Sequence, residues 1–595
     1  MNEQVDPVIR ARAVQAARGA AAFDLLLAGG TVVDVATGEL RAADVGIVGT
    51  LIASVHPQGA REDAPAVEDV AGRFLAPGFI DSHLHYESSL MAPVDYASVV
   101  VPAGTTTCVW DPHELANVLG LDGVRWAIEV SRDLPLRTLI AAPSCVPSAP
   151  GLELAGAEIG AAEMTDMLRW PEVVGVAEVM DMPGVLRGTA HMRGIVGAGL
   201  ASGKNVNGHA RGMRDADLQA YATAGVTSDH EIVEAEDFLQ KLRAGMTVEL
   251  RGSHDYVLPG VLTALATLPL LPPNLVLCTD DVFPDELVAK GGLRDTISRV
   301  IARGVSPVAA IRMTTLHAAM RLKRDDLGLV APGRQADIVV LSDLPSVAVE
   351  RVVAAGRVVA REGRLLSTLP RPHGARDTPL AHVPRGTMKL SPQPREAFEL
   401  RVGGAGRAKL RKVVGARYTS WGEVEVELRD GVVQIPRGHA AITMIHRHGR
   451  APAVPRTCLA DGWGAPRGAI ATTIAHDSHN LLVLGRDPDD MQAAANALIA
   501  CGGGMAVAER GQVTALLPLP IAGLLAETPA AETAAGFAKL REAADRVMEW
   551  QPPFRVFRGL TGISLACNPG PHPTDLGLTD GGTGEVFDPA ETLDA

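Results

Sequence analysis

Apolar residues in the middle of the chain fall in short runs that alternate with helix-like stretches. Eight runs have the length and bounding residues of buried strands, and the intervening residues 216–224 and 235–244 have helical spacing. The strands are predicted at residues 74–80, 106–110, 136–142, 173–179, 205–208, 225–228, 247–250 and 275–279. Eight βα units within about 250 residues favour an α/β fold with a closed (β/α)8 TIM-like barrel over an open sheet.

A different pattern flanks the barrel. Short strands separated by glycine turns fill residues 23–75 and return at residues 331–385. We therefore predict a small β domain that is built from both flanks, with the barrel, residues 76–330, inserted between its halves. Residues 1–22, rich in Ala and Arg, are expected to form an N-terminal helical arm.

The last part of the chain, residues 400–595, is expected to form a C-terminal α/β domain. Its strands are predicted at residues 424–428, 441–446, 469–473, 481–485 and 505–509, and a helix at 489–501 has Asp487 as cap and Pro488 in its first turn. His476 and His479 lie between two of these strands, either in a polar turn or in a loop that closes over the barrel mouth. Residues 567–575 are expected to form a loop with no assigned role.

Composition narrows the classes of function. The chain has 595 residues, 47% of them hydrophobic and 21% charged, which indicates a folded enzyme with an ample core. Its net charge of −14 argues against nucleic acid as a partner. We expect no membrane span and no signal peptide. Six scattered cysteines without a CxxC pair fit a reducing cytoplasm, and we expect a homodimer or higher homo-oligomer.

Histidines and acids follow the ends of several predicted strands. His83 and His85 are two positions apart, so on a strand both side chains point the same way. Catalytic residues of such barrels gather beyond the carboxyl ends of the strands. The further candidates there are Asp111, His113, Glu114, Glu178, His209, His230, Asp280 and Asp281. Each alone also fits a structural role, Asp280 for example as a helix N-cap; together they indicate one functional face.

Four histidines and two acids of this group can form a two-metal site. Imidazole and carboxylate suit borderline divalent cations, and one carboxylate can bridge two of them. Two such cations make water acidic enough to act as a nucleophile near neutral pH. The two acids are Glu178 and Asp280.

The order of these residues resembles the amidohydrolase superfamily and, more closely, the bacterial adenine deaminase family. The resemblance covers nearly the whole chain apart from about the first twenty residues and the stretch around 375–400. It is carried by PGFIDSHLHYESS (77–89), DPHELANVLG (111–120), AEVMDMPGV (177–185), GHA (208–210), SDHE (228–231), CTDD (278–281), RGAI (467–470), AHDSHN (475–480) and LPLPIAG (517–523).

The resemblance implies the activity: adenine and water give hypoxanthine and ammonia, in purine salvage or adenine catabolism. It implies that the six metal ligands are His83, His85, Glu178, His209, His230 and Asp280, and it points to Mn²⁺ or Fe²⁺, with Zn²⁺ also compatible with the donor set. Asp280, nearer the strand end than Asp281, is expected to carry a proton from the attacking water to the departing amine. The expected catalytic residues are Asp280, His230, Glu114 and His113, and the expected substrate-binding residues are His113, Glu114 and Glu87.

Two other functions stay open at this point. One is a cyclic-amide hydrolase of the dihydropyrimidinase type, against which Glu178 argues; the Asp-Pro-His-Glu stretch at residues 111–114 and the C-terminal domain argue against it more strongly. The other is a non-catalytic relative that binds a purine or a metal, against which the complete ligand set argues. A deaminase of the cytidine type is set aside, because no PCxxC follows the HxE at residues 85–87.

Overall fold

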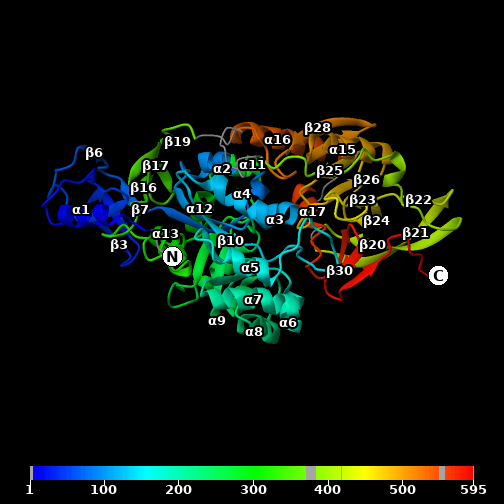
Figure 1. Ribbon diagram of the computed structural model, residues 1–595, viewed down its shortest axis with the longest axis horizontal. Coiled ribbons are helices and arrows are strands. Elements are labelled where there is room, and N and C mark those ends of the chain that lie inside the picture. Colours follow the sequence, from blue (N-terminus) through cyan, green and yellow to red (C-terminus); the bar gives the residue numbers. More distant parts are fainter. Residues whose placement is uncertain (1–3, 370–382, 417, 465, 549–555, 594–595) are drawn as a thin grey trace.

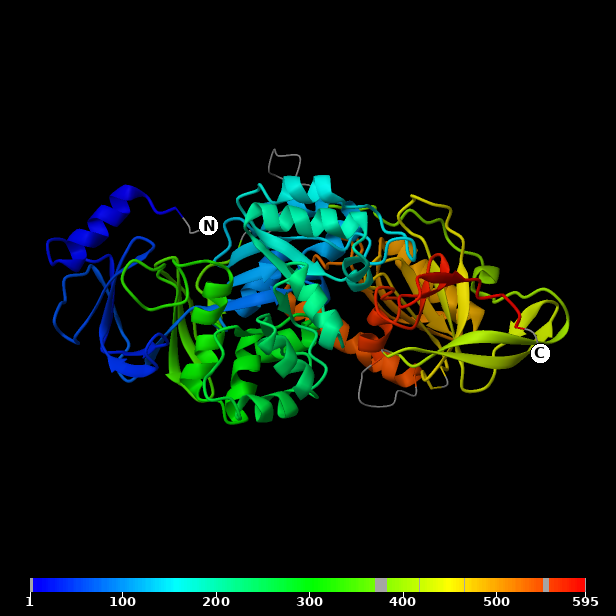
Figure 2. The same cartoon turned by 90° about the horizontal axis from the view of Figure 1, so that it is seen from below.

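The computed structural model describes residues 4–369, 383–416, 418–464, 466–548 and 556–593. The molecule is elongated: the N-terminal strands lie at one end, the barrel in the middle and the C-terminal sheet at the other end (Figures 1 and 2). Part of the predicted second β segment, residues 370–382, lies outside the described residues. No helix of the described ranges is long and apolar enough to cross a membrane.

Eight parallel strands form the barrel, as predicted. They run in the orders β12-β11-β10-β9-β8 and β13-β14-β15. Thr227 N donates to Val206 O (2.9 Å) and Asp280 N donates to His83 O (3.1 Å), and these two hydrogen bonds join the two sheets at both seams. The strands are β8 (Phe79–Leu84), β9 (Thr105–Trp110), β10 (Arg137–Ala142), β11 (Val173–Val179), β12 (Asn205–Gly208), β13 (Ser228–Asp229), β14 (Thr247–Arg251) and β15 (Leu275–Cys278).

Helices surround this barrel, and the predicted helices at 216–224 and 235–244 are present as α8 and α9. The first half carries η1 (Glu87–Ser89), α2 (Pro93–Val100), α3 (His113–Leu119), α4 (Leu121–Ser131), α5 (Ala161–Met167), α6 (Met182–Arg187) and α7 (Ala190–Ser202). The second half carries α8 (Asp215–Thr223), α9 (Ala235–Arg243), α10 (Leu258–Leu265), α11 (Pro284–Lys290), α12 (Leu293–Ala302), α13 (Pro307–Met313) and α14 (Leu316–Arg321).

The single strand predicted at residues 74–80 is wrong, because the structure divides it at Gly78. β7 (Phe74–Pro77) belongs to the flanking β sheet, whereas β8 starts the barrel. A Cβ atom at position 78 would collide with Thr106 Oγ1, so only glycine allows this close approach. As a result His83 lies inside β8, and His85 follows its last residue.

Strands from both sides of the barrel share one sheet. β7 pairs in parallel with β2 (Thr31–Asp34) and antiparallel with β16 (Ile338–Asp343), in the order β19-β18-β17-β16-β7-β2-β3. A second sheet has the order β5-β4-β1-β6. The remaining elements here are α1 (Pro7–Ala17), β1 (Leu25–Ala28), β3 (Glu39–Ala42), β4 (Asp44–Val48), β5 (Leu51–His56), β6 (Ala66–Asp69), β17 (Ala348–Ala354), β18 (Arg357–Arg361) and β19 (Arg364–Leu365).

The C-terminal part is built on a nine-stranded sheet in the order β22-β21-β20-β24-β23-β26-β25-β27-β28. Its strands are β20 (Gly406–Val414), β21 (Ser420–Arg429), β22 (Val432–Gln434), β23 (Ala440–Ile445), β24 (Arg456–Asp461), β25 (Ala469–Thr472), β26 (Leu481–Gly485), β27 (Gly504–Glu509) and β28 (Gln512–Pro518). Each of the five strands predicted here lies in β21, β23, β25, β26 or β27, extended or shortened at its ends.

Two helices pack on opposite faces of this sheet, because alternate residues of a strand point to opposite sides. Leu481 and Val483 share a core cluster with α15 (Pro488–Cys501), whereas Leu482 and Leu484 share one with α16 (Ala530–Val547). The predicted Asp487 cap is present. The other elements are η3 (Arg395–Phe398), α17 (Val556–Gly562) and a sheet of β29 (Pro571–Thr574), β30 (Gly577–Asp580) and β31 (Glu585–Phe587). The loop predicted at 567–575 is therefore partly wrong, since β29 lies within it.

Candidate functional site

Glu178, in β11, lies at the centre of four of the predicted histidines. Its Oε1 is 3.3 Å from His85 Nε2 and 3.8 Å from His83 Nε2. Its Oε2 is 2.7 Å from His209 Nδ1 and 3.2 Å from His230 Nε2. All five side chains are buried. One carboxylate thus faces two pairs of imidazoles, one pair with each oxygen.

Asp280 completes the group from the end of β15. Its Oδ1 lies 3.3 Å from His83 Nε2 and 3.4 Å from His85 Nε2. Asp280 has a φ of +56°, a left-handed conformation that aspartate adopts more readily than most residues. Asp281 points elsewhere, since its Oδ1 accepts from Ser88 Oγ (2.5 Å) and its Oδ2 pairs with Arg251 (3.0 Å). The structure therefore brings all six predicted ligand residues together.

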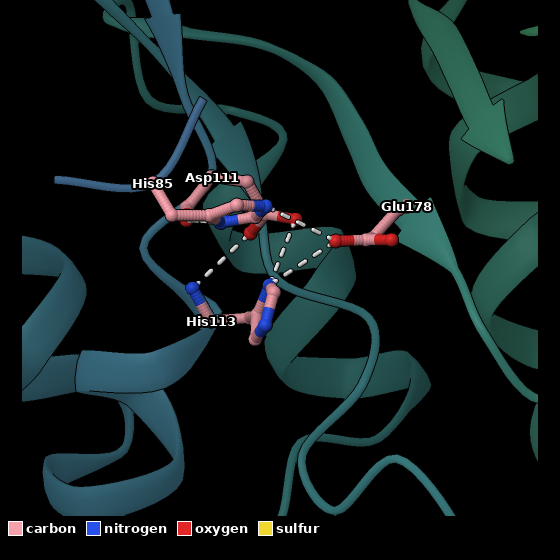
Figure 3. A group of neighbouring side chains, drawn as sticks. All are labelled: His85, Asp111, His113 and Glu178. Atoms are coloured by element: carbon pink, nitrogen blue, oxygen red, sulfur yellow. Dashed lines mark hydrogen bonds and ion pairs between the residues drawn. The ribbon is translucent and has the colours of Figure 1, made fainter. Parts of the chain in front are cut away.

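The residues after β9 form the next part of the site (Figure 3). His113 Nδ1 is 3.1 Å from Asp111 Oδ2 and 3.7 Å from Glu178 Oε1. His85 Nδ1 lies 3.0 Å from the carbonyl oxygen of Asp111, which leaves Nε2 of the same ring to face Glu178. These four residues form one of the groups whose ligand atoms are close enough to share a metal ion.

Burial and charge set the protonation of this cluster. Burial, aided by the charges of His230 and His85, lowers the pKa of His83 to about 3, so its imidazole is neutral. Burial alone would raise the pKa of Glu178, but the charge of His230 and hydrogen bonds from His209 and His230 hold it well below its usual range. His83 and Glu178 are therefore in the forms, neutral imidazole and ionised carboxylate, that bind metal ions. For His85 and His230, burial is outweighed by contact with Glu178, which raises the pKa of both imidazoles.

Unpartnered atoms in the cluster fit a cation. His83 Nε2 and His209 Nε2 are buried, and neither has a hydrogen-bond partner among the described residues. Buried polar atoms are normally satisfied, so such atoms call for an explanation. A divalent cation held by imidazole and carboxylate groups supplies one.

The two glutamates proposed for substrate binding differ in position. Glu114 lines the cavity at the barrel mouth, and burial together with the charge of Glu87 holds its pKa well above the usual range. Glu87 instead accepts hydrogen bonds from Trp110 Nε1 (2.8 Å) and Leu115 N (3.2 Å). Among the described residues the cavity wall does not include Glu87, so its contacts favour a structural role.

The C-terminal part of the chain closes the cavity. Its wall combines barrel residues with a second set from the C-terminal part, among them Ile474, His476, Asp477, Arg558, Thr561 and Asn568. Asp477 Oδ1 lies 3.5 Å from His113 Nε2, and His479 Nε2 lies 3.5 Å from Glu114 Oε2. Of the two interpretations of this segment, the loop over the barrel mouth is the one that the structure shows.

Several cavity residues were not anticipated from the sequence. Arg251 pairs with Asp280, Asp281 and Glu231, and Arg211 pairs with Glu231 (2.8 Å). Arg251 is the last residue of β14, so the strand-end rule that found the other residues also applies to it. Ser88 and Arg558 carried no comparable signal in the sequence.

Comparisons with known proteins cover almost the whole chain. The amidohydrolase family matches residues 74–359, and the adenine deaminase C-terminal domain matches residues 416–585. An adenine deaminase of Klebsiella pneumoniae subsp. pneumoniae is 55% identical over 98% of this chain and 96% of its own length. Adenine deaminase 2 of Rhizobium meliloti is 54% identical over 98% and 97%. Among solved structures, molinate hydrolase is 17% identical over 60% of this chain and 99% of its own, with a TM-score of 0.44.

Proposed function

This chain belongs to the adenine deaminase family of the amidohydrolase superfamily, and we propose that it hydrolyses adenine to hypoxanthine and ammonia. One observation carries the proposal. The segment that matches the adenine deaminase C-terminal domain supplies His476 and Asp477 to the same cavity wall as the barrel residues Glu114 and Glu178. The similarity to adenine deaminases therefore covers the wall of the cavity as well as the buried residues at its bottom.

We propose that two divalent cations occupy the site, manganese or iron, with zinc as the alternative that the same donors accept. Glu178 would bridge them, with His83 and His85 near one of its oxygens and His209 and His230 near the other, and Asp280 would join the first pair of imidazoles. When bound, the cations supply Lewis acidity that makes water a competent nucleophile near neutral pH.

The side chains of the chain itself handle the protons. Water attacks C6 of adenine, the ring loses its aromaticity and negative charge gathers at N1. Glu114, kept protonated by burial and lining the cavity, would donate a proton to N1, with His113 as the other candidate. Asp280 takes a proton from the attacking water and passes it to the amino group, with His230 as the second candidate. The C6–N bond then breaks, ammonia leaves, and the proton of the new C6 hydroxyl returns to the Glu114 carboxylate, which completes hypoxanthine and restores the acid.

We also propose a cytoplasmic, homo-oligomeric enzyme. All six cysteines are free thiols, which suits a reducing compartment. On α1, Val8 and Val14 are 73% and 51% exposed, and such apolar side chains suit a contact between subunits. Light scattering on the purified protein gives the oligomeric state.

Ammonia release from a panel of purines and cyclic amides, with added Mn²⁺, tests the function. We expect release from adenine, and slower loss of absorbance with adenosine at equal concentration. Faster turnover of adenosine would overturn the preference for the free base. Ammonia from cyclic amides alone would establish the dihydropyrimidinase type instead. Purine or metal binding without any turnover would identify a non-catalytic relative.

A further inference from the structure

A buried arginine fixes the loop at residues 475–480, which joins β25 to β26. Arg447 Nε donates to His479 O (2.5 Å), Nη2 to Ala522 O (3.0 Å) and Nη1 to Thr387 Oγ1 (3.1 Å). Arg447 is fully buried, and burial lowers its pKa to about 9. All three acceptors are neutral, and no carboxylate of the described residues forms an ion pair with this cation to offset its desolvation. An anchor of this kind costs stability, which suggests that the position of His479 matters for activity.

Backbone contacts define the tautomer of His479. Ala475 N donates to His479 Nδ1 (3.3 Å), so that in the neutral ring the proton is on Nε2. Burial, aided by the charge of His476, holds the pKa of His479 well below its usual range, and the ring is neutral. Its Nε2–H therefore faces Glu114 Oε2 at 3.5 Å, and neither atom has a hydrogen-bond partner among the described residues.

We propose that His479 is a positioning residue, which donates its Nε2–H to Glu114 Oε2 and so holds the acid that protonates the substrate. The proposal rests on the adenine deaminase function proposed above. With Oε2 engaged, the proton of the neutral Glu114 is on Oε1, next to Ser88 and His476 of the cavity wall. When that proton moves to N1, Glu114 becomes a carboxylate, and a hydrogen bond to an ionised oxygen is stronger than one to a neutral oxygen. The contact thus stabilises the product of the proton transfer.

A cation is the competing occupant of this position. Glu114, His476 and His479 have ligand atoms within 4.8 Å of one another, close enough to share an ion. A cation on His479 Nε2 requires that nitrogen to lack its proton. Because Nδ1 already accepts the Ala475 N–H, the neutral ring has its proton on Nε2. The tautomer therefore favours the hydrogen bond to Glu114 over the cation.

Two substitutions of His479 distinguish the Nε2–H contact with Glu114 from the Nδ1 contact with Ala475. The side-chain amide nitrogen of glutamine reaches the place of Nε2, whereas that of asparagine reaches only the place of Nδ1. We expect His479→Asn to lower kcat for adenine about 10- to 100-fold, the effect of one hydrogen bond to a charged group, with KM changed less than about twofold. His479→Gln should stay within about threefold of the parent. His439→Asn, in the same domain and beside Lys412 and Asp461, serves as the matched control.

The metal content of the variants and the activity of the parent enzyme distinguish a positioning role of His479 from a cation site and from failure of the proposed function. All variants should hold the same number of metal ions as the parent, as measured by mass spectrometry. Equal kcat for the Asn and Gln variants would overturn the positioning role, and loss of one metal ion in both would replace it with a cation site. If the parent releases no ammonia from adenine, the proposed function fails; an active parent with equally slow variants contradicts only the assignment of His479.

Discussion

Lys241, in α9, links residues at the ends of two barrel strands, next to two of the predicted metal ligands. Its ammonium group is fully buried, 2.7 Å from Asp229 Oδ2 and 2.8 Å from Asp237 Oδ1, and it donates to Glu231 O (3.2 Å). Asp229 in turn accepts from the backbone N–H of Ala210. Ala210 follows His209, and His230 lies between Asp229 and Glu231, so this ion group sets the backbone around two predicted ligands.

Lys241→Met should destabilise the protein strongly. At an effective dielectric constant of about 20, unit charges 2.8 Å apart attract by roughly 6 kcal/mol. Desolvation offsets part of this attraction, and breaking a buried pair typically costs about 3–5 kcal/mol. We expect the free energy of the first unfolding transition of the metal-free protein, measured in urea, to fall by about 3–5 kcal/mol. We also expect about 10- to 100-fold weaker metal binding in competition with a chelator, as for other groups that orient ligands.

The loss should depend on pH. Beside Lys241, burial still raises the pKa of Asp237, so this carboxyl is the one expected to take up a proton when the lysine is removed. When the pKa of a carboxyl is higher in the folded than in the unfolded state, the free energy of unfolding falls as the pH rises from the lower to the higher of the two values. The variant should therefore be less destabilised at pH 5 than at pH 8.

A triple variant provides the control. Lys241→Met with Asp229→Asn and Asp237→Asn leaves no buried charge in the group, and we expect it to recover more than half of the lost stability. A single Lys241→Met variant within about 0.5 kcal/mol of the parent, with unchanged metal affinity, would refute the reasoning.

Three further predictions concern the site. Glu178→Gln should lose metal and activity together, because an amide cannot present an anionic oxygen to both imidazole pairs. Full metal content and full rate in this variant would exclude a bridging Glu178. Glu153→Gln, at another buried glutamate, is the control. Asp280→Asn should keep its fold but lose about 10²- to 10⁴-fold in kcat, and an active variant would direct attention to Asp281 or His230. A soluble truncation after about residue 400 should be inactive, since it lacks the cavity residues Ile474, His476 and Asp477. Unchanged ammonia release would show that the C-terminal part has no role in catalysis.

The barrel and its central residues could be predicted because they follow from local patterns. Strand ends are marked by the change from apolar to polar residues, and the fold places such ends on one face. Hence His83, Glu178 and Asp280 meet in the structure as the pattern predicts.

Contacts between distant segments could not be predicted in this way. Asp477 meets His113 only because the C-terminal sheet docks on the barrel, and no local pattern states where it docks. The break at Gly78 was missed for a similar reason, since the apolar run continues through it and only the approach of Thr106 reveals the change of sheet. Arg251 was within reach of the strand-end rule, since it directly follows the strand predicted at residues 247–250.

The pairing of β7 with β16 is delayed while the nascent chain is being synthesised. β7 ends at Pro77 and its antiparallel partner begins at Ile338, so about 260 residues must leave the ribosome between them. At ~5–20 residues per second this takes roughly 13–50 s. During that interval one edge of β7 has no partner, and an unpaired edge is a template for association with other chains. A chain that is released before residue 338 has been made would therefore expose this edge, and we expect slower elongation through residues 78–337 to increase association of the nascent chains.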